Sequence, residues 1–150
     1  MQIITERKGD FFITTDRAML DLDVIHGFLS NHAYWCKGIQ YETVRKAADH
    51  SLNFSVFHQD KQIGYARVIS DFATVAYLGD VFILEAYRGQ GHSRWLMDQV
   101  MTHPDLQGLR RWILLTRDAH ELYKKYGWTP IAIPDRWMEK HEKNAYTVNS

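Results

Sequence analysis

An apolar run that ends in a glycine-spaced basic turn and continues as an amphipathic helix is the strongest constraint in this sequence. The turn spans residues 88–93 and has glycines at positions 89 and 91. Glycine permits positive φ, so successive backbone N–H groups can converge on one anion, and a helix that begins near Gly91 adds its unpaired amides. The pattern therefore predicts a strand, a phosphate-binding turn and a helix, in that order.

Two common phosphate motifs do not fit this turn. A P-loop requires a lysine and a hydroxyl residue directly after its second glycine, but His92 and Ser93 follow Gly91. A dinucleotide-binding fingerprint requires a third glycine, where Arg94 stands, and an acidic residue about 20 positions further on, where the chain has two arginines. The turn must bind phosphate in another way, if it binds it at all.

The turn resembles the coenzyme A loop of the GCN5-related N-acetyltransferase (GNAT) superfamily. The family pattern Gln/Arg-x-x-Gly-x-Gly/Ala is matched from Arg88 to Ser93, with Ser93 as a departure at a position where glycine or alanine is usual. The resemblance implies that acetyl-CoA binds to this turn and also pairs with main-chain groups of the preceding strand, which commonly carries a bulge and splays from its neighbour.

A second segment, residues 116–128, resembles the signature that closes the coenzyme site in the same family. Its alanine is Ala119, its tyrosine four residues later is Tyr123, and a glycine–aromatic pair ends it. The family often has asparagine three residues before the alanine, whereas this chain has Thr116. Together the two signatures imply the following coenzyme-binding residues: Val81, Phe82, Ile83, Arg88, Gly89, Gln90, Gly91, His92, Ser93 and Thr116.

The local pattern of this second segment predicts a helix. Asp118 is expected to cap it, with Ala119, Leu122 and Tyr126 on its inward face and Gly127 as a left-handed end. Tyr123 would then point partly away from that inward face.

Composition fits one domain that spans residues 1–150. The chain is 45% hydrophobic, and its 18 basic and 18 acidic residues give zero formal net charge, which argues against a general nucleic-acid binder. The single Cys36 excludes an intramolecular disulfide, the histidines show no metal-ligand spacing, and the N-terminus lacks the apolar core of a signal peptide. We therefore expect a cytoplasmic protein, monomeric or homodimeric, with no metal and no membrane or nucleic-acid partner.

Hydrophobic periodicity predicts the other elements. The expected elements are strands at 11–15, 52–57, 62–69, 74–84 and 111–116, helices at 21–29, 41–50 and 91–101 and from 118, and one or two further strands at 131–133 and 146–148. This order matches the GNAT fold, which is an α/β (α+β) architecture. It implies a mixed, mostly antiparallel central sheet that is flanked by helices and whose central strands splay.

The resemblance also implies catalytic roles. Acyl transfer to an amine requires a neutral amine, an oxyanion donor and an acid for the departing thiolate. Tyr123 matches the tyrosine that in many relatives lies near the coenzyme sulfur, and a backbone N–H at Phe82 or Ile83 is the implied oxyanion donor. Asp80 is the expected base for the amine proton, with Glu85 and His120 as weaker candidates.

The acceptor is expected to meet an aromatic loop, where Tyr34 and Trp35 offer ring faces to an ammonium group. The resemblance implies an acyl-CoA-dependent N-acyltransferase that transfers acetyl to a primary amine by direct attack in a ternary complex. The acceptor is a small-molecule amine or a peptide. Two alternatives stay open: an acyl-CoA-binding module that senses the coenzyme without catalysis, and a protein or peptide N-acetyltransferase.

Overall fold

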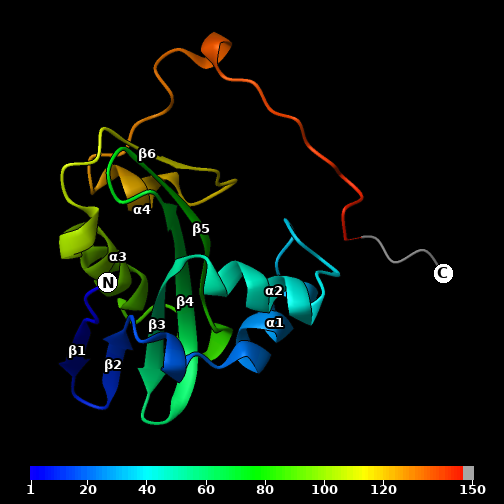
Figure 1. The fold of residues 1–150 in the computed structure, drawn as a ribbon. Coiled ribbons are helices and arrows are strands. Elements are labelled where there is room, and N and C mark those ends of the chain that lie inside the picture. The colour runs from blue at the N-terminus through cyan, green and yellow to red at the C-terminus, as the bar shows by residue number, and fades with distance from the viewer. Residues whose placement is uncertain (147–150) are drawn as a thin grey trace.

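The computed structural model describes residues 1–146 and contains one six-stranded sheet in the order β1-β2-β3-β4-β5-β6 (Figure 1). Neighbouring strands are antiparallel, except that β5 and β6 are parallel. The strands are β1 (Thr5–Lys8), β2 (Phe11–Thr14), β3 (Leu52–His58), β4 (Lys61–Ser70), β5 (Val75–Ile83) and β6 (Arg111–Leu114). This is the mixed, mostly antiparallel sheet that the sequence predicted.

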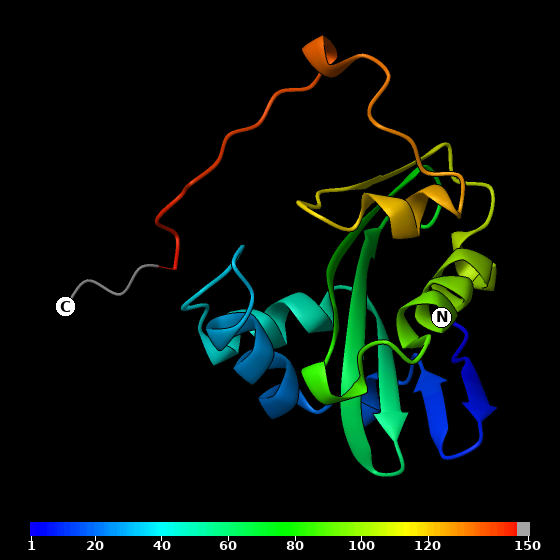
Figure 2. The ribbon, with the colours of Figure 1, turned by 180° about the vertical axis from the view of Figure 1, so that it is seen from behind.

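Helices cover both faces of the sheet. α1 (Leu22–Asn31) and α2 (Tyr41–Asp49) lie on one side, and α3 (His92–Thr102) and α4 (His120–Lys124) on the other (Figures 1 and 2). Short 3-10 turns occur at Arg17–Met19, Glu85–Tyr87, Pro104–Leu106 and Pro134–Arg136. Within residues 1–146, no helix is long and apolar enough to cross a membrane.

The two sides of the sheet carry separate buried clusters. Because successive strand residues point to opposite faces, Ala66 packs with Leu96 of α3, whereas its neighbour Tyr65 packs with Ile25 and Leu29 of α1. Both clusters contain residues that are nearly inaccessible to solvent. The central strands are therefore clamped from both sides.

A bulge interrupts β5 in the middle of the sheet. Tyr65 pairs with Phe82 and Arg67 with Gly79, so two β5 residues, Asp80 and Val81, stand opposite one residue of β4. Asp80 adopts a left-handed conformation, with φ of 52°. The bulge bends β5 and turns the Asp80 side chain toward the helical side on which Trp35 lies.

β5 and β6 separate just before the bulge. Their parallel pairing covers only Val75–Leu78 of β5, against Arg111–Leu114 of β6. The rest of β5, from Gly79 to Ile83, has no β6 partner on that side. This confirms the predicted splay of the central strands.

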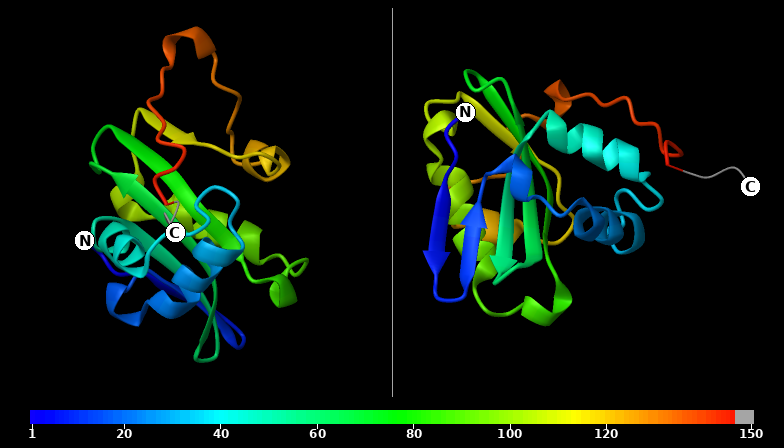
Figure 3. Two further views of the ribbon diagram at one scale, coloured as in Figure 1. Left: turned by 90° about the vertical axis from the view of Figure 1, so that its right-hand side faces the viewer. Right: turned by 60° about the horizontal axis from the view of Figure 1, so that its bottom comes forward.

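Most elements lie where the sequence predicted them, but the strand expected at 131–133 does not form. Residues 131–133 form no strand, because Pro130 and Pro134 bracket them and the segment leaves the sheet after α4 (Figure 3). The second expected strand, 146–148, falls mostly outside the described residues, and Tyr146 lies in a turn. From 129 the chain arches back toward the loop between α1 and α2, where a side chain at Gly38 would meet the carbonyl of Tyr146.

Two local predictions are also corrected. β1 was not expected, because its four residues are polar and exposed and show no alternation; pairing with β2 forms it. Asp118 does not cap α4. The helix begins only at His120, and Ala119 occupies the N-cap position without a side-chain cap; in the loop before it, Thr116 Oγ1 accepts a hydrogen bond from the Ala119 N–H at 3.2 Å.

Candidate active site

The glycine turn has the geometry of an anion site. Gly89 and Gly91 have φ of 76° and 86°, and Gly91 directly precedes α3. A Cβ built at either glycine would meet nothing within 4 Å, so open space adjoins this backbone. Residues 88–91 are exposed, so an anion can approach the turn and the start of α3 from solvent.

Two predicted coenzyme residues brace the turn with their side chains. Arg88 Nε donates a hydrogen bond to the Ile83 carbonyl at 2.9 Å. His92 is buried, and its ring lies 4.5 Å from the ring of Phe11. Burial, with smaller effects of Lys8 and His58, lowers the pKa of His92. Coenzyme binding by these two residues stays a prediction.

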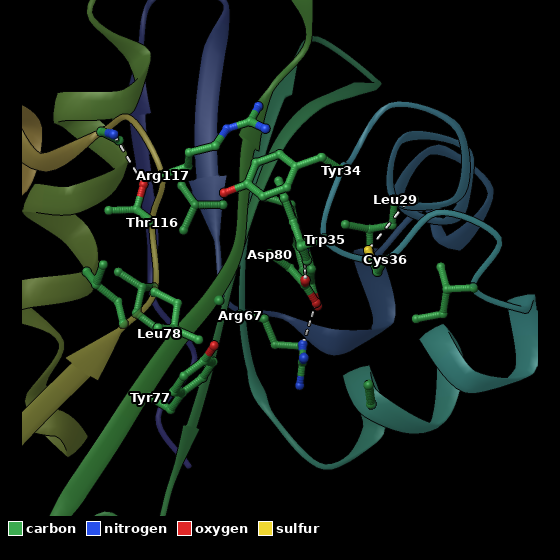
Figure 4. Close-up of a pocket in the computed structure, with 18 of the residues that line it drawn as sticks. Leu29, Tyr34, Trp35, Cys36, Arg67, Tyr77, Leu78, Asp80, Thr116 and Arg117 are labelled. Atoms are coloured by element: carbon green, nitrogen blue, oxygen red, sulfur yellow. Dashed lines mark hydrogen bonds and ion pairs between the residues drawn. The ribbon is translucent and has the colours of Figure 1, made fainter. Parts of the chain in front are cut away.

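A cleft of about 590 Å³ lies where β5 leaves β6 (Figure 4). It is walled by the bulge, by the loop between α1 and α2, and by the loop between β6 and α4. The cleft brings together six residues that the sequence nominated: Tyr34, Trp35, Asp80, Val81, Thr116 and Tyr123. The site residues therefore come from four separate parts of the chain.

Other nominated residues lie outside this cleft. The Phe82 ring stacks on Phe28 of α1 at 4.0 Å, in the core between α1 and the sheet. Ile83 is buried in the core beneath α3. Any role of these two residues toward the coenzyme rests on their backbone, as predicted.

Tyr123 is the buried residue of α4, with 7% of its surface exposed. Burial raises the pKa of its phenol to about 12, so the group is protonated at neutral pH and can donate a proton or a hydrogen bond. Leu122 and Tyr126 pack against the core as predicted, although both are only partly buried. The expectation that Tyr123 would point partly away from that face is wrong, because Tyr123 is the most deeply buried of the three. The Tyr126 hydroxyl donates toward the Arg94 carbonyl and Asp98, at the side of α3.

Asp80 connects three elements through its carboxylate. Trp35 Nε1 donates to Oδ1 at 3.0 Å, and Arg67 Nε donates to Oδ2 at 2.8 Å. Arg67 also donates to the Ser51 hydroxyl at 3.1 Å. The side chains of the ion pair are only 18% and 13% exposed, so solvent screens it weakly.

Two cleft residues were not nominated from the sequence. Arg67 belongs to a strand whose pattern indicated only a hairpin, and its partner lies 13 positions away. Arg117 lies inside the second signature without a motif role, and its guanidinium stacks on the Tyr34 ring at 3.9 Å from the ring centroid. Neither contact has a local signal, because each joins segments that are distant in the sequence.

Cys36 also lines the cleft, but it has the properties of a structural residue. It is buried, and desolvation is the main reason that its pKa is raised to about 12. Its Sγ donates to the Leu29 carbonyl. A thiol that stays protonated is a poor nucleophile. Over residues 1–146, no group of three or more His, Cys, Asp or Glu side chains could hold a metal ion.

Comparison with known proteins gives concordant results. A family model described as an acetyltransferase (GNAT) domain matches residues 49–130. A Gibberella zeae protein whose name presents it as a presumed acetyltransferase, FG08082, is 31% identical, with 79% of this chain and 78% of the relative covered.

Solved structures show the same fold. A crystal structure from Xanthomonas campestris pv. campestris, described as belonging to the GNAT family, is 50% identical, with a TM-score of 0.90 and coverage of 92% of this chain and 97% of that chain. Mycobacterium tuberculosis Rv2747, solved in complex with CoA and NLQ, is 20% identical, with a TM-score of 0.64 and coverage of 79% and 72%.

Proposed function

Because the chain belongs to the GNAT family of acetyltransferases, we propose that it transfers the acetyl group of acetyl-CoA to a primary amine by direct attack in a ternary complex. The glycine turn and the first amides of α3 bind the pyrophosphate of the coenzyme. The unpaired edge of β5 from Gly79 to Ile83 pairs with the pantetheine arm. The thioester then lies at the cleft, between the bulge and Tyr123.

The chemistry needs one bond to form and one to break. The amine nitrogen bonds to the thioester carbon, the carbon–sulfur bond breaks, and the sulfur leaves as a thiolate. Tyr123 gives its phenolic proton to that thiolate, and Asp80, directly or through water, is the nominated acceptor of the proton that the amine loses. Proton return to Tyr123 from solvent completes the cycle.

One observation carries this proposal: Tyr123 is buried in the cleft that opens where β5 leaves β6. Within residues 1–146 its hydroxyl has no hydrogen-bond partner, although its ring packs near Trp128. The ring is buried, but the hydroxyl oxygen is not one of the fully buried unpaired polar atoms, so it reaches the open space of the cleft, where a ligand atom can meet it.

The test is a substitution with a matched control. Tyr123→Phe should lower kcat by about a hundredfold or more, with acetyl-CoA affinity nearly unchanged, because the hydroxyl acts only as the thiolate develops. Tyr126→Phe removes a hydroxyl from the same segment but outside the cleft, and it should keep parental turnover. Thiol release is followed with an amine panel, and mass spectrometry identifies the acetylated amine.

Two results would contradict the proposal. If Tyr123→Phe and Tyr126→Phe turn over equally fast when chemistry limits the parent, Tyr123 is not the acid. If the parent binds acetyl-CoA but acetylates neither amines nor peptides, the protein is a coenzyme-binding module without transferase activity.

A further inference from the structure

Arg117 holds an unusual position at the mouth of the cleft. It lies in the loop between β6 and α4, and its guanidinium stacks on the ring of Tyr34, which belongs to the loop between α1 and α2. Both residues line the cleft (Figure 4). The stack therefore connects the two loops that face each other across the part of the cleft where the acceptor is expected to bind, called the acceptor side below.

The charge of Arg117 is not neutralised by the described part of the protein. Within residues 1–146, no carboxylate oxygen lies within 4.0 Å of an Arg117 nitrogen, and this includes the neighbouring Asp118. The other arginine of the cleft, Arg67, is already paired with Asp80. Arg117 thus supplies the cleft's one cation without an ion-pair partner among the described residues.

Stacking leaves the guanidinium ready for an anion. A guanidinium that lies over a ring uses its face, so its N–H groups remain free along the edge, in the fork that matches a carboxylate. The Tyr34 ring also restricts the side chain, which reduces the entropy lost on binding. Its stacking partner places Arg117 on the acceptor side and not beside the glycine turn.

We infer that Arg117, held by Tyr34, binds a carboxylate of the acceptor, so that the acceptor is an amine that also carries a carboxylate. This deepens the proposed function and rests on it, because the same cleft holds the amine. Asp80 and the ring of Trp35 suit the ammonium end, and Arg117, held over the Tyr34 ring, suits the anionic end. The cleft can therefore orient such an amino acid by both of its charges.

The experiment compares amino acids with their carboxamides. The probes are glycine, β-alanine, γ-aminobutyrate and a set of α-amino acids, each paired with its carboxamide, which keeps the shape and removes the charge. The parent should favour carboxylates in kcat/KM by about tenfold to a hundredfold, as expected for one hydrogen-bonded charge pair. Arg117→Gln should abolish this preference, mainly by raising KM.

Matched variants separate binding from folding. Arg110→Gln removes the same charge outside the cleft and should keep the carboxylate preference. Arg117→Lys should keep only part of it, because lysine lacks the planar fork. Tyr34→Phe should retain the preference, and Tyr34→Leu should weaken it, because the ring face is lost. An unchanged melting-temperature shift with acetyl-CoA verifies that Arg117→Gln is folded.

Binding of the same pairs to the CoA-bound protein, measured by calorimetry, is the second readout. It tests the inference even if no amine is acetylated, which would refute only the proposed transfer. Equal kcat/KM for carboxylates and carboxamides in the parent, or a preference that survives Arg117→Gln, overturns the inference. If nothing turns over, carboxylates that bind no better than carboxamides overturn it as well.

Discussion

Replacing Asp80 by asparagine is expected to cost about 2–3 kcal/mol of unfolding free energy. The carboxylate accepts from Trp35 Nε1 and Arg67 Nε, and hydrogen bonds to charged groups are worth about 1.5–3 kcal/mol each. The asparagine oxygen can keep one donor, but its NH2 group must then face the other. For a domain of this size the loss lowers the melting temperature by about 5–10 °C.

Asparagine is the right replacement because of the backbone. Asp80 has φ of 52°, a conformation that asparagine tolerates and that other side chains adopt at a cost of about 1–2 kcal/mol. Asp80→Ala loses the same contacts and also adopts this backbone conformation at a cost. Its free energy of unfolding should therefore fall below that of Asp80→Asn by about 1 kcal/mol beyond the effect of the lost contacts. That difference separates the strain at the bulge from the interactions of the carboxylate.

A double-mutant cycle measures the ion pair itself. Urea unfolding of Asp80→Asn, Arg67→Gln and the double variant, without ligand, should give a coupling energy of about 1–3 kcal/mol, because both partners are shielded from solvent. Effects that add to within about 0.5 kcal/mol would refute the reasoning, since the pair would then hold nothing together.

Kinetics then decide between two roles of Asp80. If Asp80 accepts the amine proton, Asp80→Asn removes the low-pH limb of kcat/KM, and Trp35→Phe leaves that limb in place. If Asp80 only positions the acceptor loop, both variants raise the acceptor KM and neither changes the limb. Two acceptors with different amine pKa values are compared, because a limb that follows the amine belongs to the substrate.

Two further predictions concern the coenzyme turn. CoA at a hundredfold its dissociation constant should stabilise the parent by about 2.7 kcal/mol, and Gly91→Glu should abolish this stabilisation. Gly91→Ala carries the same left-handed strain without the added negative charge, so its melting-temperature shift with CoA should be larger than that of Gly91→Glu. An undiminished shift in Gly91→Glu would mean that the turn is misassigned. Burial lowers the pKa of His92, so the unfolded chain binds a proton on this imidazole more readily than the folded protein does. The stability that neutral His92 contributes is therefore complete above a pH of about 6.5 and is lost as the pH falls toward the folded-state pKa. His92→Phe should reduce the fall in melting temperature between pH 7 and pH 4. Part of the fall should remain, because burial also lowers the pKa of His103. A variant with the parent's dependence of melting temperature on pH would assign the loss of stability in acid to other groups.

The coenzyme side of the site is predictable because its determinants are local. A strand, two glycines with positive φ and a helix start follow one another within residues 81–92, and the proposed anion site needs only the backbone of this segment. The side chains of this segment were harder to place. The packing of His92 depends on Phe11, which reaches it from the hairpin of β1 and β2. No pattern within the turn contains that contact.

Helix periodicity failed at α4 because the helix is too short for a face to dominate. With five residues it has little more than one turn, and tertiary packing decides which residue is buried. Its N-cap is Ala119, which has no side chain able to cap it, and Tyr123 is its buried residue and lines the cleft. The motif thus singled out a tyrosine that lies in the cleft, while the periodicity argument gave the wrong orientation for it.

The acceptor side is assembled from contacts that no window of sequence contains. Trp35 reaches Asp80 over 45 positions, and Arg117 reaches Tyr34 from beyond the sheet. Both contacts require the splay, because a β6 paired along the whole of β5 would fill the space where these side chains meet. The coenzyme turn can therefore stay constant while a few residues on two loops change the acceptor. Substitutions at Tyr34 and Arg117 should accordingly alter which amine is used and leave acetyl-CoA binding as it is.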